Sequence, residues 1–189
     1  KYNYLDEYIT DLRRGLDRVY FPYEKIGKKD PNSKYLQLNT HLLQIENEFY
    51  GTIRPKRSAA SGERPLAALG QRGVEYIEVR CVDLDPFEPV GIDQRHMRFL
   101  DTFLLVCLLT ESPTDSREES ARMVRNQTAV VENGRQLGQE LERDGESIAL
   151  SQWATELLNE CAKVADLMDQ HTDSDLYRSA VDALSLIHI

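Results

Sequence analysis

Apolar residues recur at steps of three and four along five stretches of the chain, a spacing typical of amphipathic helices. The first stretch runs from Leu5 to Val19 and should end before Pro22. The second follows Asp93, which is well placed as an N-cap, and should end by Pro113. This second helix is apolar nearly all round, so we expect it to be central to the core. The spacing predicts three further helices, over residues 116–134, from about 151 to 168, and around 176–181.

Between the first two predicted helices the apolar pattern shortens and favours extended chain. Residues 73–83 carry β-branched and aromatic side chains without a helical period, and they predict a strand. Residues 35–49 also favour a strand or extended chain, whereas 27–33 indicate a turn and 54–65 a polar loop. The order of helix, strands and then helices predicts an α+β fold rather than an alternating parallel sheet.

Alternation along the strand predicted at residues 73–83 divides its side chains between two faces. The apolar row, which we expect to face the core, consists of Ile77, Val79 and Cys81. The polar row consists of Tyr76, Glu78 and Arg80. A carboxylate and a guanidinium placed side by side could hold a metal ion and the phosphate that it bridges. An ordinary surface ion pair fits the same spacing, so alternation alone leaves both interpretations open.

Further polar side chains lie upstream of this strand. If residues 35–49 are extended, Glu46, Glu48 and Tyr50 share one face, which suits either a substrate amine or metal ion or a solvated surface. In the predicted loop, Arg54 and Arg57 could contact phosphate oxygens through charge-assisted hydrogen bonds. They could equally keep that loop soluble.

Composition narrows the classes of function. The formal net charge of -9 argues against nucleic-acid binding, which requires clustered basic residues. No apolar run approaches the length of a membrane span. The histidines, His41, His96 and His171, offer no pair with metal-ligand spacing. We therefore expect neither nucleic acid nor membrane as a partner.

The three cysteines, Cys81, Cys107 and Cys161, are odd in number and lie in apolar pattern. This arrangement favours free buried thiols over disulfides, zinc ligands or nucleophiles, and it indicates a reducing compartment. The chain has no initiator methionine, so its start says nothing about targeting. We interpret residues 184–189 as a non-native tail and exclude His188 as a ligand.

Three blocks of sequence resemble one family. They are residues 43–50 (LQIENEFY), 53–57 (IRPKR) and 73–80 (GVEYIEVR), and residues 83–87 and 98–101 continue the likeness. Together they resemble glutamate–cysteine ligase of the proteobacterial type. The resemblance runs from about residue 4 to 109 and is traceable to Arg135.

This resemblance implies a glutamine-synthetase-like antiparallel sheet that binds ATP as co-substrate, L-glutamate, L-cysteine and Mg²⁺ or Mn²⁺. Glu78 would be a metal ligand, Arg80 a catalytic residue contacting phosphate, and Tyr50 part of the cysteine site. Glu46 and Glu48 would lie near the substrates, and Arg54 and Arg57 near the phosphates. The implied cytoplasmic reaction is the first step of glutathione biosynthesis: ATP phosphorylates the glutamate γ-carboxylate, and the cysteine amine then attacks the acyl phosphate.

The resemblance also implies limits. The segment that carries most of the family's metal-binding carboxylates is absent, so we expect this chain to be inactive alone. Residues 1–112 would form a partial catalytic region and 113–183 a helical region, followed by the tail at 184–189. The alternative is a non-catalytic helical interaction module, in which Tyr76, Glu78 and Arg80 scatter in solvent.

Overall fold

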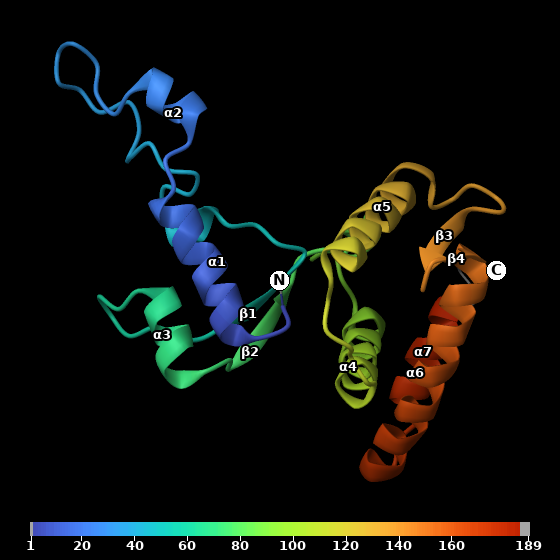
Figure 1. Cartoon of the computed structure of the whole chain (residues 1–189). Coiled ribbons are helices and arrows are strands. Elements are labelled where there is room, and N and C mark those ends of the chain that lie inside the picture. The colour runs from blue at the N-terminus through green and yellow to red at the C-terminus, as the bar shows by residue number, and fades with distance from the viewer. Residues whose placement is uncertain (1, 186–189) are drawn as a thin grey trace. The chain divides into compact units, whose positions relative to one another are not determined.

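The computed structural model describes residues 2–185, which form two compact units divided between Asp83 and Leu84. The first unit contains α1 (Leu5–Asp17), α2 (Phe21–Ile26), a 3₁₀ helix (Glu46–Glu48), β1 (Ile53–Lys56), α3 (Pro65–Arg72) and β2 (Tyr76–Val79) (Figure 1). The second contains α4 (Gln94–Leu109), α5 (Arg117–Asn133), β3 (Glu140–Arg143), β4 (Glu146–Ala149), α6 (Leu150–Thr172) and α7 (Leu176–Ser185).

The five helices predicted from apolar spacing are confirmed as α1, α4, α5, α6 and α7. Two of them, α4 and α5, start at a capping side chain. The Asp93 carboxylate accepts a hydrogen bond from the His96 backbone N–H at 2.8 Å, as its position predicted. Ser116 caps α5 in the same way, accepting from the Glu119 N–H at 3.0 Å. The mixed helices and antiparallel strands confirm the α+β class.

The core of the first unit lies between α1 and α3. Tyr8 and Ile9 of α1 are buried against Leu66 and Leu69 of α3, and Phe49 packs against them. The helix α3 was not predicted, although Pro65 at its first position is a recognised start signal. The packing of α3 on α1 leaves the two strands at the edge of this core.

Strands β1 and β2 pair antiparallel, with Arg54 opposite Glu78 and Ile53 opposite Val79. The strand predicted at 73–83 is confirmed, although only Tyr76–Val79 pair. The loop predicted at 54–65 is wrong for Arg54 to Lys56, which form most of β1. Proline is compatible with this strand because each strand of a two-stranded sheet keeps one side free of ladder hydrogen bonds.

The extended chain predicted for residues 35–49 is wrong as a strand. It forms bends, two isolated bridges and the 3₁₀ helix. Side-chain amides take the place of a partner strand: Gln37 donates to the Tyr23 and Gly27 carbonyls at 2.7 and 2.9 Å, and Gln44 accepts from the Leu38 N–H at 2.9 Å. These side-chain bonds satisfy backbone groups that would otherwise need a partner strand.

In the second unit, α4, α6 and α7 enclose a core of Val106, Cys161, Ala165 and Val181. Helix α4 buries only one face, because Leu108 and Leu109 are exposed, so its predicted central place in the core holds in part. The unpredicted hairpin β3–β4 precedes α6. Its turn residues Asp144 and Gly145 both have positive φ, at 53° and 86°, as a type I′ turn requires.

Burial was predicted for all three cysteines, and it is confirmed only for Cys161; Cys81 and Cys107 are exposed thiols. Of the proposed tail, Leu184 and Ser185 belong to α7, while residues 186–189, including His188, lie outside the described residues. The structure divides the chain at residue 83 by packing. The predicted boundary at residue 112 separates a catalytic from a helical region, so it concerns catalysis and stays a prediction. Within residues 2–185, no helix has the length and hydropathy to span a bilayer.

Candidate functional site

Three charged side chains converge on the ladder of β1 and β2. Arg54 donates from Nε and Nη2 to Glu78 Oε2, at 2.9 and 2.5 Å. Arg80 donates from Nη2 to Glu78 Oε1 at 3.0 Å. The register explains the first contact, because Arg54 faces Glu78 across the strands. Strand alternation explains the second, because Glu78 and Arg80 are two residues apart.

Tyr50 joins this group from the segment that precedes β1. Its ring centroid lies 4.9 Å from the Arg80 guanidinium carbon and 5.8 Å from that of Arg54. The ring is 73% exposed, so one side remains open to solvent or to a ligand. Tyr50, Glu78 and Arg80 therefore converge as predicted. The cavity in this unit is lined by Tyr8, Phe49 and Arg54 among others and by none of these three residues, so the concave surface that we expected around them stays a prediction.

The opposite face of β2 differs from the prediction. Ile77 is 43% exposed, Cys81 is exposed and Val79 is half-buried, so the expected core-facing row is wrong. The physical reason is that the core of this unit forms between α1 and α3, away from that face. Alternation placed the side chains on the correct sides but could not show which side is covered.

The two arginines hold Glu78 ionised. Hydrogen bonds from Arg80 and then Arg54 stabilise the carboxylate and lower the pKa of Glu78 to about 2. The same contact raises the pKa of Arg80 above its ordinary value. The site therefore holds one permanent negative charge between two permanent positive charges.

The Glu78 carboxylate keeps capacity for one more partner. Each carboxylate oxygen can accept two hydrogen bonds. Oε2 accepts both of its bonds from Arg54, whereas Oε1 accepts one from Arg80. Through the remaining position on Oε1 the carboxylate could bind a hard cation such as Mg²⁺ with one oxygen. No group of three or more His, Cys, Asp or Glu side chains that could hold a metal occurs within residues 2–185.

Glu46 and Glu48 have local partners. The 3₁₀ helix replaces the expected extended chain, so the predicted shared face of Glu46, Glu48 and Tyr50 is wrong. Glu46 Oε2 accepts from the Leu66 N–H at 2.9 Å, at the start of α3, and the Glu48 carboxylate accepts from the Gln44 N–H. Both carboxylates therefore stabilise local backbone, whatever their role toward substrate.

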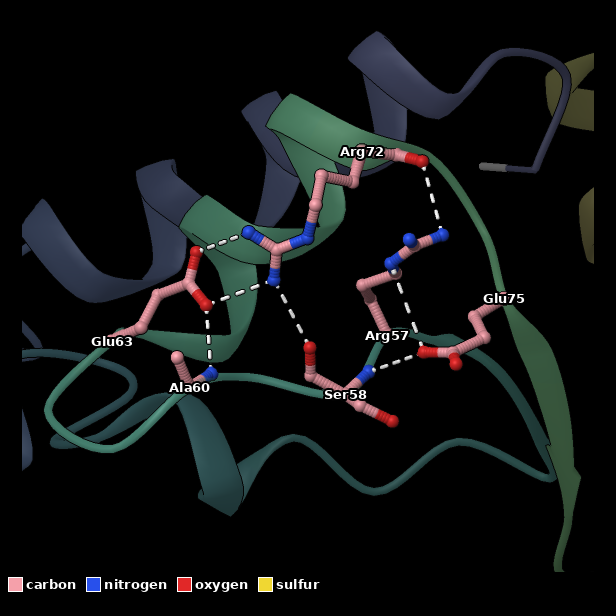
Figure 2. A network of polar contacts seen from close by, with 6 residues as sticks. All are labelled: Arg57, Ser58, Ala60, Glu63, Arg72 and Glu75. Atoms are coloured by element: carbon pink, nitrogen blue, oxygen red, sulfur yellow. Dashed lines mark hydrogen bonds and ion pairs between the residues drawn. The ribbon is translucent and has the colours of Figure 1, made fainter.

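Arg57 belongs to a separate network that Figure 2 shows. It donates to the Arg72 carbonyl at 3.2 Å, and its Nε lies 3.7 Å from Glu75 Oε2. Arg72 in turn forms a two-pronged bond with Glu63, at 2.7 and 2.8 Å, and donates to the Ser58 carbonyl. This network fastens the loop after β1 to α3 and to the start of β2 (Figure 2).

One feature of the site was missed from sequence: Arg54 is only 7% exposed. Besides Glu78, it donates from Nη1 to the Phe49 carbonyl at 2.6 Å. The alternation in Ile53-Arg54-Pro55 gives no sign of this burial. It depends on a strand partner 24 residues further along the chain.

Comparisons with known proteins agree with the family resemblance of residues 43–50, 53–57 and 73–80. The sequence profile described as glutamate-cysteine ligase matches residues 1–130. The glutamate–cysteine ligase of Azotobacter vinelandii is 49% identical and that of Pseudomonas fluorescens Pf-5 is 45% identical, each over 182 residues covering 96% of this chain and 34% of the relative. The chain thus spans about a third of the length of these curated relatives.

A solved structure is also similar. The crystal structure of glutamate–cysteine ligase from Francisella tularensis, in complex with AMP, matches 100% of this chain and 37% of its own chain. The TM-score is 0.90 and the sequence identity 36%. The similarity in fold therefore extends along both units of the chain.

Proposed function

Since the chain belongs to the glutamate–cysteine ligase family, we propose that it is a segment of an ATP-dependent ligase that joins the γ-carboxylate of L-glutamate to the amine of L-cysteine. The observation that carries the proposal to specific residues is the convergence of Tyr50, Glu78 and Arg80 on one face of the ladder. The AMP bound to the similar Francisella enzyme supports the use of a nucleotide.

In this proposal the reaction has two steps and begins glutathione biosynthesis. The glutamate γ-carboxylate attacks the terminal phosphorus of ATP, forming γ-glutamyl phosphate and releasing ADP. The amine of cysteine then attacks the acyl carbon, phosphate leaves, and the amine loses a proton. Both steps bring anions together, so the site must supply positive charge where negative charge develops.

Arg80 is the residue that we assign to the transferred phosphate. Its guanidinium donates one N–H to Glu78 and also interacts with the Tyr50 side chain, and the donors that remain suit phosphate oxygens. Tyr50 stacks over Arg80 and offers an exposed ring beside the reacting groups, which suits the cysteine substrate. In this proposal Glu46 and Glu48 lie near the substrates and Arg57 lies near the phosphates. All three keep the hydrogen bonds and ion pairs described above.

Glu78 is the residue of this chain that we assign to Mg²⁺ or Mn²⁺, through the open position on Oε1. When bound, the metal would neutralise phosphate charge and bridge the nucleotide to the protein. Its other ligands would come from nucleotide phosphates and from parts of the ligase beyond this segment. This is why the segment alone should be inactive.

We also propose that β1 and β2 are two strands of a larger, glutamine-synthetase-like antiparallel sheet. Each strand keeps one edge that is unpaired within the described part of the chain. Tyr76 and Ile77, on opposite faces of β2, are exposed and lack neighbours on an adjoining strand. Additional strands would cover both features. The reaction would take place in the cytoplasm, where reducing conditions keep the three cysteines as thiols.

An exchange experiment tests the proposal. In the Azotobacter vinelandii ligase, the stretch that matches this chain would be replaced by residues 4–183. The measurement is ATP- and cysteine-dependent formation of γ-glutamylcysteine. We expect activity within about tenfold of the parent enzyme, and loss of that activity on Arg80→Gln. An exchanged enzyme that folds and binds nucleotide but forms no product would contradict the proposal.

A further inference from the structure

We propose that Arg54 is a positioning residue, which fixes Glu78 and Tyr50 relative to each other and does not contact phosphate itself. This inference rests on the proposed function and extends it. It replaces the expectation that Arg54, as one of several arginines near the site, binds a phosphate group.

The first argument is how the donors of Arg54 are used. Its guanidinium reaches Glu78 with Nε and Nη2 and the Phe49 carbonyl with Nη1, so all three nitrogens are engaged within the protein. The side chain is also 9% exposed, against 38% for Arg80. A phosphate group therefore has access to Arg80 and little access to Arg54.

The second argument is what Arg54 connects. The Phe49 carbonyl and the Tyr50 ring belong to the segment before β1, whereas Glu78 belongs to β2. Arg54 contacts all three, so it links the proposed cysteine-binding residue to the proposed metal ligand. A single guanidinium therefore hydrogen-bonds both the Phe49 backbone and the Glu78 carboxylate.

The third argument concerns the free coordination position. Arg54 anchors Oε2 with two bonds and Arg80 anchors Oε1 with one, so the carboxylate cannot turn without breaking at least one of these bonds. Without the Arg54 bonds, Arg80 would hold Glu78 by Oε1 alone, and the open position on that oxygen would no longer be fixed. Outer contacts of this kind orient metal ligands, and their loss typically weakens metal binding by about 10-fold to 100-fold.

Lysine at position 54 tests this role, because an ammonium keeps the charge but not the fork. The experiment uses the full-length ligase that carries this segment, with Mn²⁺ binding followed by electron paramagnetic resonance in the absence of substrates. We expect Arg54→Lys to weaken Mn²⁺ binding by about 10-fold and to raise the KM for cysteine. Arg54→Met should weaken Mn²⁺ binding at least as much.

Arg72 provides a matched control. Its guanidinium also holds a carboxylate with two prongs and one backbone carbonyl, but the carboxylate is that of Glu63 (Figure 2). Arg72→Lys should therefore leave Mn²⁺ binding within about twofold of wild type, while thermal unfolding shows whether either variant has lost stability. If Arg54→Lys binds Mn²⁺ like Arg72→Lys, whatever its KM for ATP, Arg54 does not position Glu78. Failure of the wild-type enzyme to make γ-glutamylcysteine would instead contradict the proposed function, so the two failures are distinct.

Discussion

Arg54 and Glu78 lie directly opposite each other on β1 and β2, and Arg54 Nη2 is 2.5 Å from Glu78 Oε2. The pair is asymmetric, because the arginine is buried and the carboxylate keeps one oxygen partly open. A cross-strand ion pair of this kind aligns two strands as well as two charges. Local strand pairing and the proposed chemistry of the site therefore depend on the same contact.

The first prediction concerns the titration of Glu78. Its pKa in the folded chain is about 2, below the ordinary value of 4.5, because Arg80 and Arg54 stabilise the ionised form. Between these values the unfolded chain binds more protons, so the contribution of Glu78 to stability is present above pH 4.5 and is lost as pH falls toward 2. Carbon-13 NMR of the carboxyl group measures this directly. Titration near 4.5 in the folded chain would show that the arginines do not engage Glu78.

The second prediction concerns Asp169, which starts α7 from the end of α6. Its buried carboxylate accepts hydrogen bonds from the N–H groups of Tyr177 and Arg178 and from the Ser174 hydroxyl. Burial alone would raise the pKa of Asp169, but these bonds outweigh it and lower the pKa. Asp169→Ala should reduce the free energy of unfolding by about 1–3 kcal/mol, as chemical denaturation would measure. Asp166→Ala, which removes an exposed partner of Arg178, should have a much smaller effect.

The third prediction separates the structural role of Glu46 from a substrate role. Because its carboxylate accepts from the Leu66 N–H, Glu46→Ala should lower stability by about 1 kcal/mol, measured by thermal unfolding of this chain without substrates. Glu46→Gln keeps an oxygen acceptor and should recover most of that loss. Equal stability of the alanine variant and wild type would argue that the contact does not hold the start of α3.

The fourth prediction concerns the thiols. Cys161 is 0% exposed, and burial, with Cys107 and Glu160 nearby, raises its pKa to about 11. A thiol reagent at neutral pH should therefore modify Cys81 and Cys107 in the native chain, and Cys161 only after unfolding. Cys81 should react faster than Cys107, because partial burial raises the pKa of Cys107. Peptide mass spectrometry against time would measure each rate, and native modification of Cys161 at the rate of Cys81 would contradict the packing of α6.

The five helices α1, α4, α5, α6 and α7 were predictable because each one has a periodic apolar face. Asp93 and Ser116 cap their helices through side-chain oxygens, a feature that can be seen in sequence. The hairpin β3–β4 was missed although Asp144-Gly145 is a strong turn signal. In that case the information was present, and the helical interpretation of the surrounding residues hid it.

Other features could not be predicted because they depend on distant partners. Alternation placed Glu78 and Arg80 on one face correctly, since it needs only the strand itself. The burial of Arg54 requires its pairing with β2, and the exposure of Ile77 requires knowing that α1 and α3 pack elsewhere. The 3₁₀ helix at Glu46–Glu48 arises where side-chain amides replace a strand partner.

The central claim is that Glu78 is a metal ligand of a glutamate–cysteine ligase. Its most direct test is Mn²⁺ binding and γ-glutamylcysteine formation by the full-length ligase carrying Glu78→Gln, a change that keeps the size of the side chain and removes its charge. We predict that Mn²⁺ binding weakens by at least about 10-fold and that product formation falls more steeply still. Unchanged Mn²⁺ affinity together with retained activity would contradict the account.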